Sequence, residues 1–186
     1  MKLPALALAA ILSMTGNAYA TSLGLVATHD LGDFDGGETF LETFTVATTG
    51  TIDHSLTFDI TGDLYAGSGV FDISLADIIN IDGLTAKIFT TSNTITPYAS
   101  FTPIGGDLLV LPLGTYFGIG SYTLKIGGQA TGTGLGGLLP AGAYTVAAVT
   151  VPVPEPETWA MLLVGMGLVG LRARQKAKAK REAALA

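Results

Sequence analysis

The sequence predicts an all-β protein, an antiparallel β-sandwich preceded by a signal peptide and followed by one short transmembrane helix. Apolar and polar residues alternate with period two in several segments between residues 21 and 152, and Gly, Asp or Pro residues separate these segments. No long amphipathic helical stripe occurs before the C-terminal region. The length of the region between the two termini fits a single domain.

The N-terminal segment, residues 1–20, has the pattern of a secretory signal peptide. Lys2 supplies a positive charge, residues 3–14 are almost wholly apolar, and Ala18 and Ala20 form a small-x-small cleavage site. We therefore expect cleavage after Ala20. The alternative is an N-terminal membrane anchor, although the apolar run is short for a span.

The middle region, residues 21–152, is expected to contain the strands of the sandwich. Residues 55–60 alternate most clearly, because Leu56, Phe58 and Ile60 fall on one face of an extended chain. The other candidate strands are residues 39–46, 69–75, 85–90, 108–111, 121–126 and 144–151. Short strands with turn residues at this spacing favour an antiparallel β-sandwich.

The same region is strongly acidic. It has twelve carboxylates against Lys87 and Lys125, a formal net charge of −10 with neutral histidines. This charge argues against nucleic-acid binding and against docking on anionic lipid or polysaccharide by charge alone. The chain has no cysteine, which excludes thiol nucleophiles and thiolate metal sites.

Four of the carboxylates, Asp30, Asp33, Asp35 and Glu38, lie close together in the sequence among glycines. Such a cluster is a candidate site for a hard cation such as Ca²⁺. The spacing fits no EF-hand, and a solvated acidic loop is the favoured interpretation, so no cofactor is expected.

The residue patterns do not predict an enzyme. His29 and His54 are the two histidines, and Asp53 and Ser55 flank His54 in the sequence. Neighbouring residues on a strand point to opposite faces, so this adjacency does not indicate a triad. No Gly-x-Ser-x-Gly motif occurs, and carboxylates are too numerous to indicate a glycosidase pair. We assign no catalytic residue.

The C-terminal region combines an apolar run with a basic tail. Residues 159–171 are thirteen apolar residues, predicted to form the membrane helix with Trp159, Leu162, Leu163, Leu168 and Leu171 as anchors. As a helix this run covers roughly 20 Å, short of the ~30 Å hydrocarbon core. Arg172 and Arg174 follow as stop-transfer charges, and the basic tail, residues 175–186, is expected in the cytoplasm.

Pro154, Glu155 and Pro156 directly precede this run. The succession of Pro-Glu-Pro, a glycine-bearing apolar segment and an arginine cluster resembles the PEP-CTERM sorting signal of Gram-negative bacteria, here residues 153–174. The resemblance implies an inner-membrane intermediate, processing by an exosortase-type membrane transpeptidase, and delivery to the cell surface or extracellular matrix, with exopolysaccharide as a possible partner. The basic tail is longer than is usual for the family. The alternative is a plain single-pass anchor.

The segment 40–44 also resembles the Phe-x-Asp-x-Phe motif of one PEP-CTERM subgroup, with Glu42 in place of Asp between Phe40 and Phe44. A plain strand is the favoured interpretation. On a strand these three residues share a face, so either that face is half solvated or Glu42 finds a partner at its edge.

The function that we expect is a structural or adhesive role at the cell surface or in the biofilm matrix. The alternative is a glycan-binding module held by a plain C-terminal helix. Its candidate contact residues are Tyr65, Tyr98, Phe101, Tyr116 and Tyr122. Clustering of these aromatics on one exposed face would favour binding, and burial of all of them would exclude it.

Overall fold

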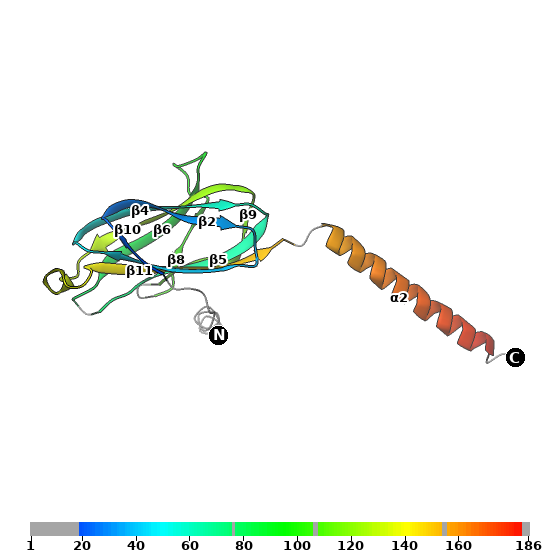
Figure 1. The fold of residues 1–186 in the computed structure, drawn as a ribbon. Helices are drawn as coiled ribbons and strands as arrows, with labels where there is room; N and C mark the ends of the chain where they lie inside the picture. The colour runs from blue at the N-terminus through cyan, green and yellow to red at the C-terminus, as the bar shows by residue number, and fades with distance from the viewer. Residues whose placement is uncertain (1–18, 76, 106–107, 154–155, 184–186) are drawn as a thin grey trace. The chain divides into compact units, whose positions relative to one another are not determined.

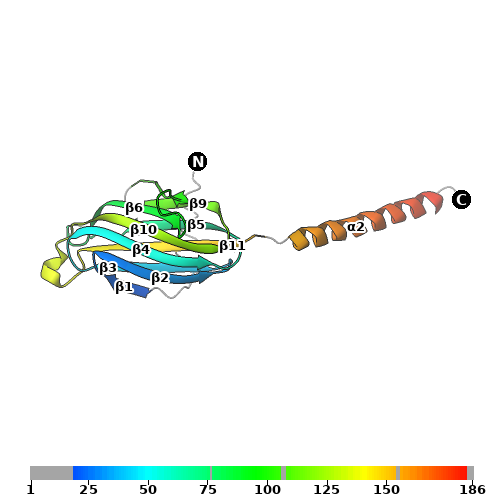
Figure 2. The same cartoon turned by 90° about the horizontal axis from the view of Figure 1, so that it is seen from above.

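The fold consists of two β-sheets packed face to face and one C-terminal helix. The computed structural model describes residues 19–75, 77–105, 108–153 and 156–183. Figure 1 shows the two layers from the side, and Figure 2 shows them from above. One sheet has the order β1-β3-β11-β5-β9-β8, and the other has the order β2-β4-β10-β6-β7. The all-β prediction is confirmed.

The strands extend over most of the region between the termini. They are β1 (Tyr19–Leu23), β2 (Val26–Phe34), β3 (Thr39–Val46), β4 (Gly50–Ile60), β5 (Leu64–Asp72), β6 (Ile81–Thr90), β7 (Ala99–Ser100), β8 (Thr102–Pro103), β9 (Leu108–Phe117), β10 (Gly120–Ala130) and β11 (Gly142–Pro152). A 3₁₀ turn, η1 (Gly134–Gly137), lies between β10 and β11.

The expected antiparallel sandwich departs from antiparallel pairing at one edge of each sheet. Strand β1 pairs with β3 in parallel, and β2 pairs with β4 in parallel. Successive strands in this part of the chain reverse direction and also change sheet. Two strands that are separated by one strand in the sequence therefore lie in the same sheet and run in the same direction, as β1 and β3 do, and as β2 and β4 do. The other strand pairs are antiparallel.

Strand β2 replaces part of the expected acidic loop. Its side chains alternate between half-buried and exposed from Val26 to Asp30, and the pairing register with β4 shifts between Asp30 and Asp33. Gly32 lies in this irregularity with a φ of +86°, a backbone conformation that favours glycine. The extra residue restores the alternation, so that Asp33 is exposed and Phe34 is buried.

The core lies between the sheets. The largest fully buried side chains are Tyr144, Phe44, Phe117, Ile52, Leu56, Leu64, Ile81, Ile126, His54, Val46, Val70 and Val146. Burial of an aliphatic or aromatic side chain stabilises the fold by about 1.5–3 kcal/mol relative to exposure. The core is therefore the main source of stability in a chain that has no disulfide.

The C-terminal unit begins after Pro152, where the chain divides into two compact units. Its helix α2 spans Pro156–Ala183, so it begins before and ends well after the expected residues 159–171. Part of the basic tail is thus helical. The expected membrane span is not seen: within the described residues, no helix combines the length and the apolar character needed to cross a bilayer.

Candidate functional site

Three of the five candidate aromatics form one exposed group, which we call the tyrosine surface: Tyr65, Tyr98 and Tyr116. Tyr65 on β5 is directly opposite Tyr116 on β9, and their ring centroids lie 5.9 Å apart in an edge-to-face arrangement. Their side chains are 40% and 45% exposed. Because opposite residues of an antiparallel pair share a face, both rings stand on the outer side of the sheet.

Tyr98 joins this group from the loop that precedes β7. Its hydroxyl donates to the carbonyl oxygen of Tyr116 at 2.7 Å, and its side chain is 42% exposed. The rings of Phe117 and Tyr122 lie 5.4 Å from its own ring. Tyr98 is therefore held on one side by buried aromatics. The other two candidates, Phe101 and Tyr122, are buried at 8% and 5% exposure.

An acidic group borders the tyrosine surface. A hydrogen bond to the Asp63 carboxylate raises the pKa of Tyr116 above its usual value of 10.0, and the neighbouring phenols of Tyr98 and Tyr65 act in the same direction. The surface thus presents aromatic faces together with a carboxylate and phenol oxygens. This combination suits a ligand that has both an apolar face and hydroxyl groups.

A second group, the polar cluster, lies between the sheets and consists of the half-buried Thr21 and His29 and the buried Glu42, His54 and Tyr144. The Thr21 hydroxyl donates to Glu42 Oε1 at 2.5 Å, and His29 Nε2 lies 3.2 Å from the same oxygen. Glu42 is 8% exposed on β3. Glu42 therefore has partners on β1 and β2, as in the second of the two arrangements considered for its strand face, and is not solvated.

The remaining members of the polar cluster lie deeper. His54 Nδ1 is 2.7 Å from the Tyr144 hydroxyl, and His54 Nε2 is 2.7 Å from the carbonyl oxygen of Gly24. A carbonyl oxygen only accepts, so Nε2 carries the hydrogen and Nδ1 accepts from Tyr144. Burial lowers the pKa of His54, and burial followed by the charge of Glu42 raises the pKa of Tyr144. Both side chains are therefore neutral at pH 7.

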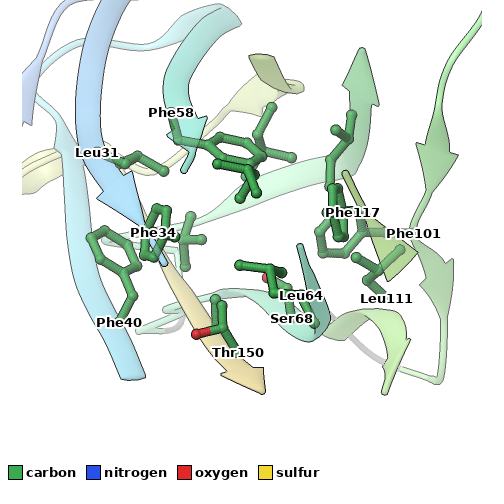
Figure 3. A pocket seen from close by; sticks show the side chains of 16 residues that line it. Leu31, Phe34, Phe40, Phe58, Leu64, Ser68, Phe101, Leu111, Phe117 and Thr150 are labelled. Atoms are coloured by element: carbon green, nitrogen blue, oxygen red, sulfur yellow. The ribbon is translucent and has the colours of Figure 1, made fainter. Parts of the chain in front are cut away.

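An apolar cavity of about 50 Å³ lies in the sandwich interior (Figure 3). Leu31, Phe34 and Phe40 line one part of it, and its two polar lining side chains are Ser68 and Thr150. Ser68 Oγ donates to the carbonyl of Ala147 at 2.8 Å, and Thr150 bonds the backbone of Glu38. The described lining residues therefore supply no titratable group to this cavity. Its volume also lies far below the ~300 Å³ of a typical small-molecule pocket.

The candidate calcium ligands do not converge. Asp30, Asp33 and Asp35 are exposed, as is Glu38, and Asp30 Oδ1 accepts from the backbone nitrogen of Gly32 at 3.1 Å. Across the described parts of the chain, no group of three or more His, Asp or Glu side chains is placed to hold a metal ion.

The residues of the two terminal signals are only partly described. Ala18, Pro154 and Glu155 lie outside the described residues, whereas Ala20 belongs to β1 and Pro156 begins α2. The anchor residues Leu162, Leu163 and Leu168 are exposed on α2, as are the stop-transfer residues Arg172 and Arg174. Trp159 and Leu171 lie on the same helix, but their side chains are outside the described part.

Comparison with protein families identifies the C-terminal segment. Residues 152–177 match the profile of the PEP-CTERM protein-sorting motif. The match supports an exported protein that is transiently anchored in the membrane through this segment and processed by an exosortase. The motif also implies a C-terminal membrane segment. No curated protein shows significant sequence similarity to the chain.

Solved structures resemble the sandwich only weakly. The pre-peptidase C-terminal domain of a collagenase from Bacillus anthracis is 12% identical, with a TM-score of 0.42, over 73% of this chain and 99% of that one. The periplasmic g-type lysozyme inhibitor PliG from Aeromonas hydrophila is also 12% identical, with a TM-score of 0.32, over 72% and 98%. Likenesses at this level do not bear on function.

Proposed function

We propose that this chain is an adhesive or structural protein of the cell surface or extracellular matrix, and that its sandwich attaches to carbohydrate through the tyrosine surface. The PEP-CTERM motif supports export and sorting. The observation that favours adhesion is the exposed grouping of Tyr65, Tyr98 and Tyr116.

The tyrosine surface has the properties of a prearranged binding face. Tyr65 and Tyr116 hold each other edge to face, and the hydroxyls of Tyr98 and Tyr116 are both engaged in hydrogen bonds. Side chains that are already ordered lose less conformational entropy on binding. The apolar face of a pyranose ring packs against such rings, while Asp63 accepts hydrogen bonds from sugar hydroxyls.

Charge selects the kind of carbohydrate. The sandwich has a net charge of −10, and its two lysines, Lys87 and Lys125, are opposite each other on β6 and β10 of the other sheet. An anionic polysaccharide would be repelled, so a neutral glycan is the expected ligand.

The test measures binding of the processed chain to neutral oligosaccharides, by NMR or on a glycan array. Tyr65→Ala and Tyr116→Ala are expected to weaken binding at least tenfold. Ile95→Ala, at a residue 91% exposed and outside the tyrosine surface, is the matched control and should leave binding unchanged. Binding that survives both tyrosine substitutions would refute the role of this surface.

The fate of the C-terminus separates the two forms of the proposal. Intact-mass analysis of membrane and extracellular fractions from the native host should find a species that starts at Thr21 and ends near residues 154–156. A membrane-bound species that runs to Ala186 would instead indicate the alternative, a glycan-binding module retained by a plain C-terminal helix.

A further inference from the structure

The expected signal-peptide cleavage site coincides with a folded strand. Strand β1 spans Tyr19–Leu23 and pairs in parallel with β3, with Tyr19 opposite Glu42 and Thr21 opposite Phe44. Cleavage after Ala20 removes two of the five paired positions. The remaining three residues form a very short edge strand, which needs anchors beyond its backbone hydrogen bonds.

The new chain end arises beside a buried carboxylate. The Thr21 hydroxyl already donates to Glu42 Oε1 at 2.5 Å. Only three bonds separate Thr21 Oγ1 from the Thr21 nitrogen, so the nitrogen lies within about 6 Å of Glu42 Oε1. Before cleavage this nitrogen is an uncharged amide, and after cleavage it is an amine that is mostly protonated at pH 7.

We propose that the α-ammonium group of mature Thr21 binds Glu42 and completes the polar cluster, so that removal of the signal peptide creates the ion pair that holds the N-terminal strand in place. The other end of this segment is already fixed, because the Gly24 carbonyl accepts from His54. Leu23 lies between these two points and packs against the core, as does Leu25 directly after Gly24.

The proposal accounts for the position of Glu42. A carboxylate that is 8% exposed needs compensating partners. Thr21 contributes one hydrogen bond, and His29 is a charged partner only when protonated. An ammonium group at the chain end supplies the full positive charge that the uncleaved chain lacks.

The proposal also sets an order of events. Signal peptidase must act on an extended and accessible segment, whereas Tyr19 and Ala20 are paired with Glu42 and Thr43 once β1 has docked. Cleavage therefore precedes docking of β1 on β3, and the docked strand is the mature one.

The test is a double-mutant cycle on the chain without its signal peptide, residues 21–186, purified in detergent. The first change acetylates the Thr21 amine or retains Ala20 as an extra N-terminal residue, and neither change alters the core. The second change is Glu42→Gln. Each N-terminal change is expected to lower the melting temperature by about 3 °C with Glu42 present and to have little effect in Glu42→Gln.

Glu38→Gln is the control, because Glu38 is an exposed carboxylate at the start of the same strand region. Acetylation should remain destabilising in this variant. Equal effects of acetylation with and without Glu42 would overturn the proposal, as would a native mature protein that does not begin at Thr21. If Glu42→Gln fails to fold, the chain with Glu42 is tested by itself. If acetylation of Thr21 then leaves its melting temperature unchanged, that result is sufficient to overturn the proposal. The inference depends on export of the chain and is independent of carbohydrate binding.

Discussion

The hydrogen bond between Tyr144 and His54 provides the sharpest test of how the sandwich is stabilised. Both side chains are fully buried, and the donor and acceptor atoms are 2.7 Å apart. The substitution Tyr144→Phe removes only the hydroxyl. The ring remains stacked on Phe44, with centroids 5.2 Å apart and planes 28° apart, so hydrophobic packing is preserved.

The expected loss in the free energy of unfolding comes from His54 Nδ1, which remains buried after the Tyr144 hydroxyl is removed. His54 Nε2 is committed to the Gly24 carbonyl, so Nδ1 keeps a buried lone pair without a donor. Leaving a buried acceptor unsatisfied costs about 1–3 kcal/mol in the free energy of unfolding. For a sandwich of this size we expect the melting temperature to fall by about 4–12 °C.

The assay is thermal unfolding of the processed chain followed by circular dichroism. Tyr122→Phe is the matched control, because its hydroxyl donates at 2.9 Å to the carbonyl of Gly118, a residue that is only half-buried. We expect this control to lose less than about 1 kcal/mol. If the two substitutions lower the melting temperature equally, the reasoning about the buried histidine is wrong.

Three further predictions concern pH, packing and electrostatics. Burial lowers the pKa of His54 below 6.5, so as the pH falls the unfolded chain takes up a proton at this residue before the folded chain does. The contribution of neutral His54 to the free energy of unfolding is therefore complete above pH 6.5 and is lost as the pH falls toward the folded-state pKa. Thermal unfolding at decreasing pH measures this loss. Gly132→Ala should destabilise the fold by about 1–3 kcal/mol, because the added methyl group overlaps the backbone carbonyls of Ile78 and Ala141, whereas Gly24→Ala has ordinary contacts and should be nearly neutral in the same melting assay. Asp63→Asn should lower the pKa of Tyr116 toward 10.0, and an ultraviolet titration that finds no change would contradict the hydrogen bond between them.

Strands whose alternation is uninterrupted could be predicted from the sequence. Residues 39–46 are the clearest case, since the observed β3 has the same bounds. Strand β2 was hidden because its second half carries the exposed acidic residues Asp30 and Asp33, and because Gly32 shifts the alternation by one position. Strand β1 was hidden because its first two residues belong to the expected signal peptide.

The parallel pairings could not be predicted in the same way. Period-two alternation shows which side chains of a strand face the core, but it does not show which sheet the strand joins. The pairing of β1 with β3 and of β2 with β4 depends on the chain changing sheet between them. That choice is made by packing between distant segments.

For the candidate sites too, single residues could be recognised from the sequence, but the contacts between distant segments could not. The sequence suggested the exposed tyrosines as candidates, but their grouping depends on the register between β5 and β9, which places Tyr65 opposite Tyr116. Glu42 was recognisable as a carboxylate on an otherwise apolar strand face. Its partners were not, because Thr21 and His29 reach it from two other strands, one in each sheet.

Helix α2 connects the weak membrane signal with the function of the sorting motif. The helix has 28 residues, yet its apolar run of thirteen residues covers roughly 20 Å of a ~30 Å hydrocarbon core. Gly165, Gly167 and Gly170 within the run bury little apolar surface, and Arg172 and Arg174 must reach the interface at its end. We expect a segment with these properties to hold a chain in a membrane less firmly than a full-length span does. Weak retention suits a segment whose motif implies transient anchoring before exosortase processing.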